Sequence, residues 1–147
     1  MSEKLSCSYV TYIGSSADKV WHALTDAEIT AAWWDRSNVS DWQVGSTWEH
    51  RKVDGSGEVD GTGTVLESVP GQRLSMTFPT GVPSKVTFDI EPYHEIVKLT
   101  LTHEDLADEN LRAIVASVWA AILSNLKTLL EGGQVLPQSP LAMLQGG

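Results

Sequence analysis

The sequence contains a single cysteine and few positively charged side chains. Its 147 residues include ten Lys and Arg against 19 Asp and Glu, which gives a formal net charge of -9. Nucleic-acid binding depends on clustered Lys and Arg, so this balance argues against a nucleic-acid surface and against anionic membranes. Cys7 alone cannot form an internal disulfide, which favours a reducing compartment.

Long apolar runs are also lacking. The sequence has no stretch of 18 consecutive apolar residues, and its N-terminus has no apolar signal segment. We therefore expect a cytoplasmic protein that does not cross a membrane. The apolar fraction of 41% and the charged fraction of 20% are those of an ordinary globular chain, and the length suits one domain.

The N-terminal part alternates with a period of two and then becomes helical. Residues 5–13 carry apolar side chains on one parity, which predicts a strand. Ser16 is a suitable N-cap for a first short helix, and Asp26 for a second one that ends at Trp33 or Trp34.

Beyond Asp35 the period returns to two for about half of the chain, which predicts a meander of antiparallel strands. The last element is an amphipathic helix over residues 108–131, which Gly132-Gly133 ends. At 1.5 Å per residue it is about 36 Å long, enough to cross a sheet. Its predicted apolar stripe consists of Leu111, Ile114, Val115, Val118, Ile122, Leu126, Leu129 and Leu130.

Together these elements predict one α+β domain over residues 1–133 and a tail over residues 134–147. A helix and a sheet must bury their apolar faces against each other. We expect a curved antiparallel sheet of about six strands wrapped on the long C-terminal helix, with two short helices after the first strand. The tail has no usable period, so it either packs on the domain or stays loose.

Three parts of the chain resemble a known superfamily: residues 20–26 followed by Trp33-Trp34, residues 86–90 with 99–103, and residues 119–132. They resemble the START-like (SRPBCC) helix-grip superfamily, which includes Bet v allergens and polyketide cyclases. Within it they are similar to the branch of the activator of heat-shock protein 90 ATPase. The resemblance implies the helix-grip fold and a cavity between sheet and long helix that holds a small hydrophobic molecule in many relatives. It supplies no catalytic motif, and this sequence lacks the additional N-terminal domain of the larger eukaryotic activators.

Two histidines are candidates for a polar contact in such a cavity. His103 shares the parity of Leu99 and Leu101, which predicts that it faces the interior. It either orients a ligand or acts as a general base, or it is a strand-end histidine bonded to backbone or water. His50, on the parity of Trp48, has the same alternatives.

Signatures of metal, nucleotide and nucleophilic chemistry are lacking. His103-Glu104 point to opposite faces of a strand and cannot readily close a metal site. Gly61-Thr62-Gly63 lacks the further glycine, the lysine and the helix of a phosphate loop. We expect no metal, no cofactor and no assigned catalytic residue.

Six tryptophans are unusual for this length. An aromatic ring with one polar group suits both a core and the wall of a ligand pocket. Trp33 and Trp34, at the end of a helix, are candidates for a mobile entrance. The expected ligand-binding residues are Trp33, Trp34, Trp48, His50, Phe78, Phe88, His103, Val115 and Trp119.

Three hypotheses for function follow. The first is a protein, monomeric or homodimeric, that binds a small hydrophobic or aromatic molecule in the cavity. The second is a cyclase, lyase or hydrolase that uses the same cavity with His50 or His103 as acid or base. The third is an interaction module that stimulates a chaperone ATPase through its acidic exterior. The excess of aromatic residues on elements that enclose the cavity favours binding over catalysis.

Overall fold

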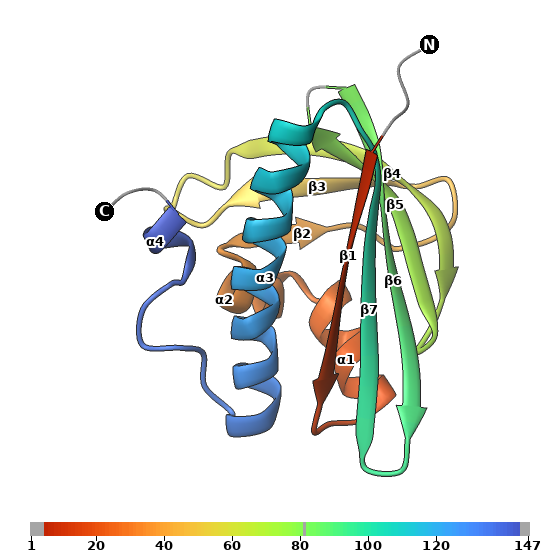
Figure 1. Ribbon diagram of the computed structural model, residues 1–147, viewed down its shortest axis with the longest axis vertical. Coiled ribbons are helices and arrows are strands. Elements are labelled where there is room, and N and C mark those ends of the chain that lie inside the picture. The colour runs from red at the N-terminus through yellow and green to blue at the C-terminus, as the bar shows by residue number, and fades with distance from the viewer. Residues whose placement is uncertain (1–4, 81, 145–147) are drawn as a thin grey trace.

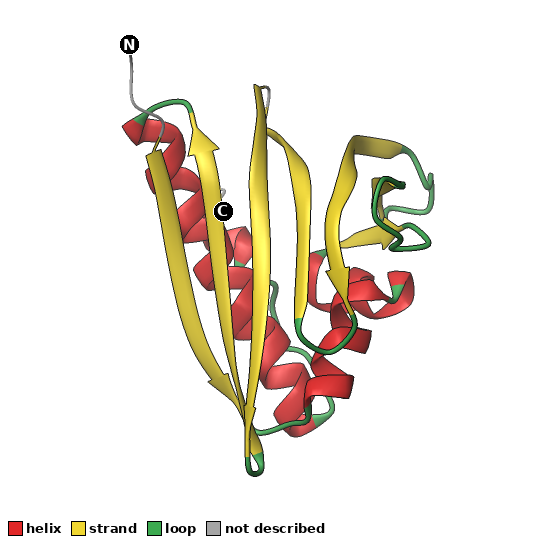
Figure 2. Ribbon diagram, turned by 90° about the vertical axis from the view of Figure 1, so that its right-hand side faces the viewer, coloured by secondary structure: helices red, strands yellow, loops and turns green. Residues whose placement is uncertain are grey.

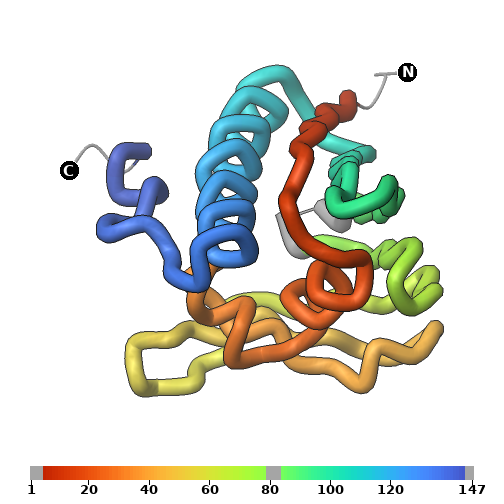
Figure 3. The backbone as a smooth tube through the Cα atoms, turned by 90° about the horizontal axis from the view of Figure 1, so that it is seen from below, coloured from red at the N-terminus to blue at the C-terminus, as the bar shows by residue number. Residues whose placement is uncertain are grey.

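The computed structural model of the chain describes residues 5–80 and 82–144. Within these residues, seven antiparallel strands form one sheet in the order β1-β7-β6-β5-β4-β3-β2. The long helix α3 lies along one face of this sheet (Figure 1, Figure 2), and the sheet bends around it (Figure 3). The elements are β1 Leu5–Ile13, α1 Ala17–Thr25, α2 Ala27–Trp34, β2 Arg36–Val39, β3 Thr47–Lys52, β4 Val59–Val69, β5 Arg73–Thr80, β6 Val82–Tyr93, β7 Ile96–Leu106, α3 Glu109–Gly132 and α4 Leu141–Leu144.

This arrangement confirms the predicted α+β helix-grip fold and corrects the number of strands. Among the described residues the sheet has seven strands, not about six. The additional strand is β2, which pairs with β3 so that Asn38 lies opposite His50. Its sequence, Arg-Ser-Asn-Val, shows no apolar alternation, so the two-residue period does not reveal it.

The two short helices begin where their predicted capping residues place them, and Asp108, predicted as the first residue of the long helix, is its N-cap. The Ser16 hydroxyl accepts a hydrogen bond from the Lys19 amide at 3.2 Å, and the Asp26 carboxylate accepts from two amides at the start of α2. The Asp108 carboxylate accepts from the Leu111 amide at 2.8 Å and begins α3, which Gly133 ends with a φ of 79°. These contacts satisfy amides and carbonyls that a helix end leaves unpaired.

Helix α3 provides the apolar surface on which the sheet packs. Trp119, Ile122, Leu123 and Leu126 are almost completely buried, whereas Ile114 is 51% exposed, so the predicted stripe is wrong at that position. By length and composition alone α3 is apolar enough to cross a membrane, with a mean hydropathy of 1.6 over 18 residues. The core helix of a soluble domain has the same property, and here the buried face of α3 is part of the core.

The free edge of β1 is held by the last turns of α3. The Gly14 amide donates to the Glu131 carboxylate at 2.8 Å. The Lys127 ammonium donates to the Tyr12 carbonyl at 2.5 Å and to Glu131 at 2.6 Å. These contacts cover part of a strand edge that would otherwise present unpaired backbone groups.

The described part of the tail packs on the domain. Figure 1 shows it leaving the end of α3 and returning beside that helix to α4. The Leu136 amide donates to Asn125 Oδ1 at 2.8 Å, and the Ser139 hydroxyl donates to the Asp35 carboxylate at 2.6 Å. Val135 and Leu141 pack against the core. Residues 134–144 are therefore an ordered extension of the domain.

Gly63 on β4 permits a contact between the strands on its two sides. The Trp48 indole N–H, from β3, donates to the Thr77 carbonyl of β5 at 2.8 Å. A Cβ at Gly63 would overlap both the Thr77 carbonyl oxygen and the Trp48 indole nitrogen. The completely buried Trp48 therefore depends on the missing side chain at Gly63.

We predict that Gly63→Ala lowers the free energy of unfolding by about 2–4 kcal/mol, because it overpacks the core and displaces the Trp48 hydrogen bond. Urea unfolding measures the change. Gly132→Ala is the control, since a Cβ there meets no atom within 4 Å. Equal stability of the two variants would contradict the role of Gly63.

Candidate functional site

Aromatic side chains fill the space between the sheet and the middle of α3. The centroid of the Trp119 ring lies 5.2 Å from that of Trp34, 5.9 Å from Phe78 and 5.8 Å from Phe88. These are the distances of rings in contact. The cavity expected at this level is therefore occupied by the protein's own side chains.

His103 lies inside this cluster, and both of its ring nitrogens are hydrogen-bonded. The Trp119 indole N–H donates to Nδ1 at 2.9 Å. An indole nitrogen can only donate, so Nδ1 is unprotonated and the proton of the neutral ring is on Nε2. Nε2 then donates to the Ser84 hydroxyl oxygen, 2.7 Å away. Burial lowers the pKa of His103 to about 4.

The interior position predicted for His103 is confirmed, since the residue is 0% exposed. Its partners are the side chains of Ser84 and Trp119, not the backbone or water of the simpler alternative. A general base needs a free lone pair within reach of its substrate. His103 has none in this arrangement, and it connects α3 to β7 and β6.

A pocket of about 360 Å³ opens beside the aromatic cluster. Its floor contains Trp34, at the end of α2, and Phe78 on β5, whose rings are almost parallel at 4° with centroids 6.1 Å apart. Helix α3 and the tail form the opposite wall through Val118 and Leu141. The remaining lining residues are Asp35, Arg36, His50, Asp60, Ser139 and Ala142.

His50 is the titratable ring of this pocket. Its Nδ1 lies 2.6 Å from Oδ1 of Asn38, which is completely buried on the neighbouring strand. Burial and, less strongly, the positive charge of Arg36 lower the pKa of His50 to about 4, and the Asp60 carboxylate partly opposes this shift. The ring is therefore neutral near pH 7. With the amide oxygen facing it, Nδ1 carries the proton and Nε2 has a lone pair.

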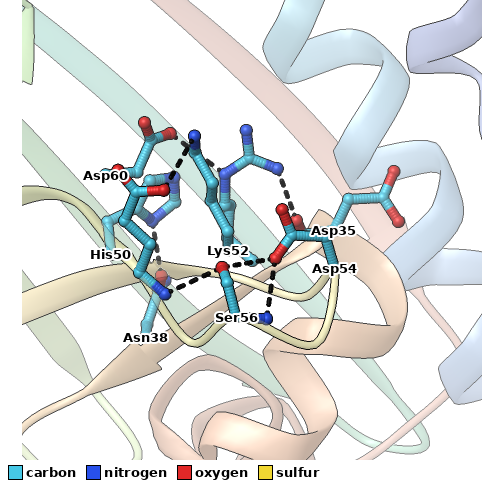
Figure 4. Close-up of polar contacts among 9 residues, drawn as sticks. Asp35, Asn38, His50, Lys52, Asp54, Ser56 and Asp60 are labelled. Atoms are coloured by element: carbon cyan, nitrogen blue, oxygen red, sulfur yellow. Dashed lines mark hydrogen bonds and ion pairs between the residues drawn. The ribbon is translucent and has the colours of Figure 1, made fainter.

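The rim of the pocket is charged, and each of its charged groups has a hydrogen-bond partner. Arg36 donates from Nε to the Asp60 carboxylate at 3.1 Å and from Nη1 to the Asp35 carbonyl at 2.7 Å (Figure 4). The Asp35 carboxylate accepts from the Ser139 hydroxyl at 2.6 Å. Two carboxylates and one guanidinium therefore surround an aromatic floor.

The structure separates the expected ligand-binding residues into two groups. Trp34, His50 and Phe78 line the pocket. Trp33, Trp48, Phe88, His103 and Trp119 are buried in the interior, and the half-buried Val115 packs against the core. The Trp33 indole donates to the Ala23 carbonyl at 3.0 Å, so this ring is fixed in the core and not at an entrance.

The sequence interpretation did not identify Arg36, Asp60 or the tail residues as part of the site. Arg36 lies on the strand that the periodicity missed. Val118 belonged to the predicted apolar stripe of the long helix, so its place in a pocket wall could have been predicted. The tail offered no signal beyond its scattered apolar residues.

Residues 15–131 match the family described as activator of Hsp90 ATPase homolog 1-like protein. The chain belongs to this family. The match ends before the tail, so the pocket wall formed by Ser139 and Leu141 lies outside the matched residues.

Solved structures of similar proteins have the same fold. A protein from Bordetella parapertussis is 27% identical, with a TM-score of 0.77 over 95% of this chain and 81% of that one. One from Cytophaga hutchinsonii is 28% identical, with a TM-score of 0.70 over 88% and 96%. The Aha1 dimer from Colwellia psychrerythraea is 22% identical, with a TM-score of 0.74 over 88% and 98%. A search of curated sequences finds no match.

The buried His103 and the half-buried His50 make stability dependent on pH. Their pKa values of about 4 lie below the ordinary 6.5, so the unfolded chain binds more protons between these pH values. We predict that the free energy of unfolding falls as pH decreases from 6.5 to 4, by about 3 kcal/mol for each histidine.

Urea unfolding at a series of pH values measures this loss. His103→Gln removes one titrating ring, so it is expected to make the dependence less steep between pH 6.5 and 4. A flat profile of the unsubstituted protein in this range would show that the rings are not held neutral.

Proposed function

We propose that the protein binds a small apolar or aromatic molecule in the pocket between α2, β3 and the tail. The observation that carries the proposal is a pocket with an aromatic floor of Trp34 and Phe78 and one polar ring, His50. Ligand pockets are mostly apolar with a few placed polar groups, and 360 Å³ is at the small end of their range of about 300–1,000 Å³.

The chemistry of the two histidines supports binding over turnover. Both nitrogens of His103 have protein partners. His50, with a pKa of about 4, is a weak base. A general acid or base works best when its pKa is near the operating pH. A cytoplasmic location and a monomeric or homodimeric state are part of the same proposal.

A substitution that fills the pocket tests the proposal. Val118→Trp places a large side chain at the α3 wall, so it is expected to weaken binding of small aromatic compounds by about tenfold or more. Isothermal titration calorimetry with a panel of such compounds measures the affinity.

Ile114→Trp is the matched control, because Ile114 is one turn away on α3 and 51% exposed. It should leave the affinity unchanged. Equal affinities of all three proteins, or no binding by any compound, would reject the pocket as the binding site.

A second candidate function is stimulation of a chaperone ATPase, which the family description favours. The formal charge of -9 suggests that an association of this kind would use exposed acidic side chains. Such contacts weaken with salt, because the screening length falls from about 10 Å at 0.1 M to about 3 Å at 1 M.

We predict that the protein raises the ATPase rate of purified heat-shock protein 90 at low salt and that the stimulation decreases as salt increases. The rate of ATP hydrolysis, with and without the protein, is the measurement. Val118→Trp should stimulate as well as the unsubstituted protein if the pocket is not involved. A rate that is unchanged at every salt concentration would exclude this function.

A further inference from the structure

We propose that the pocket selects uncharged aromatic molecules that donate a hydrogen bond, as a phenol does, and that Nε2 of His50 accepts it. This inference rests on the proposed function and names the class of ligand.

The side chain of Asn38 fixes the orientation of the His50 ring. The β2–β3 register places the two residues opposite each other. Asn38 is completely buried, and its backbone amide donates to the buried Thr30 hydroxyl at 2.9 Å, which ties β2 to α2. Its side-chain oxygen lies 2.6 Å from Nδ1 of His50. The buried Asn38, anchored through its backbone, therefore holds one nitrogen of the His50 ring in place with its side-chain oxygen.

The other ring nitrogen is available to a ligand. A carbonyl oxygen can only accept, so Nδ1 carries the proton and Nε2 is an acceptor. Within residues 5–80 and 82–144, Nε2 has no hydrogen-bond partner, and His50 lines the pocket. Figure 4 shows Asn38 and Asp60 on different sides of the ring. A ligand donor is the partner that this nitrogen lacks.

The surrounding rings favour an aromatic body for the ligand. The His50 centroid lies 5.4 Å from Trp34 and 5.7 Å from Phe78, and both rings meet the imidazole edge to face. A ligand ring on the Trp34 and Phe78 floor would therefore have its substituent close to His50.

The charges of the rim disfavour an acidic ligand. The carboxylates of Asp35 and Asp60 outnumber the guanidinium of Arg36, which already donates to Asp60. A ligand carboxylate would meet like charges and an imidazole that has no proton on Nε2. The low pKa of His50 keeps the ring neutral at pH 7, in agreement with this preference.

Three probes that share one ring system test the inference by calorimetry: 2-naphthol, 2-methoxynaphthalene and 2-naphthoate. The naphthol is expected to bind about tenfold more tightly than its methyl ether, because only the naphthol donates a hydrogen bond. The naphthoate should bind most weakly. In His50→Phe, the naphthol and the ether should bind with equal affinity. The control is Glu49→Gln, at the residue before His50 on β3, which should keep the tenfold difference in affinity.

The tautomer can be measured without a substitution. Nitrogen-15 chemical shifts of the His50 ring at pH 7 should show the proton on Nδ1, and a proton on Nε2 would overturn the inference. Equal binding of naphthol and ether would overturn the donor preference while the proposed pocket stands. No binding by any probe would reject both proposals.

Discussion

The hydrogen bond from Trp119 to His103 joins the long helix to the sheet, and the interior is arranged around it. Because the indole can only donate, the bond fixes the imidazole tautomer and directs its proton to Ser84 on β6. Leaving either buried partner unpaired would cost about 1–3 kcal/mol. The rings of Phe78 and Phe88 pack against Trp119. Because Phe78 is part of the pocket floor, the same bond helps to position that floor.

The helices and the fold class could be predicted because their signals are local. Ser16 and Asp26 are short polar residues placed directly before apolar periodicity, and each caps the helix that it precedes. Strand β2 carries no such signal. It forms because it pairs with β3 and because the Asn38 backbone amide donates a hydrogen bond to the Thr30 hydroxyl. Neither contact can be predicted from the four residues of β2 alone.

The candidate site was predictable only in part, since a tryptophan suits both a core and a pocket. The indole N–H of Trp33 donates to the Ala23 carbonyl, and that of Trp48 to the Thr77 carbonyl across Gly63. Each ring is thereby held in the interior. These partners lie 10 and 29 residues away in the chain. No spacing rule indicates such pairs, so the division between core and pocket needs the tertiary structure.

The tail places one wall of the pocket outside the part of the chain that matches the family. Leu141 and Ser139 approach the opening, whereas the most deeply buried residues belong to earlier elements. The matched residues therefore supply the fold, the floor and the charged rim, and the tail adds one further wall. Changes among a dozen residues after α3 can accumulate over evolution and alter the shape of that wall, while the selection that preserves the core acts elsewhere.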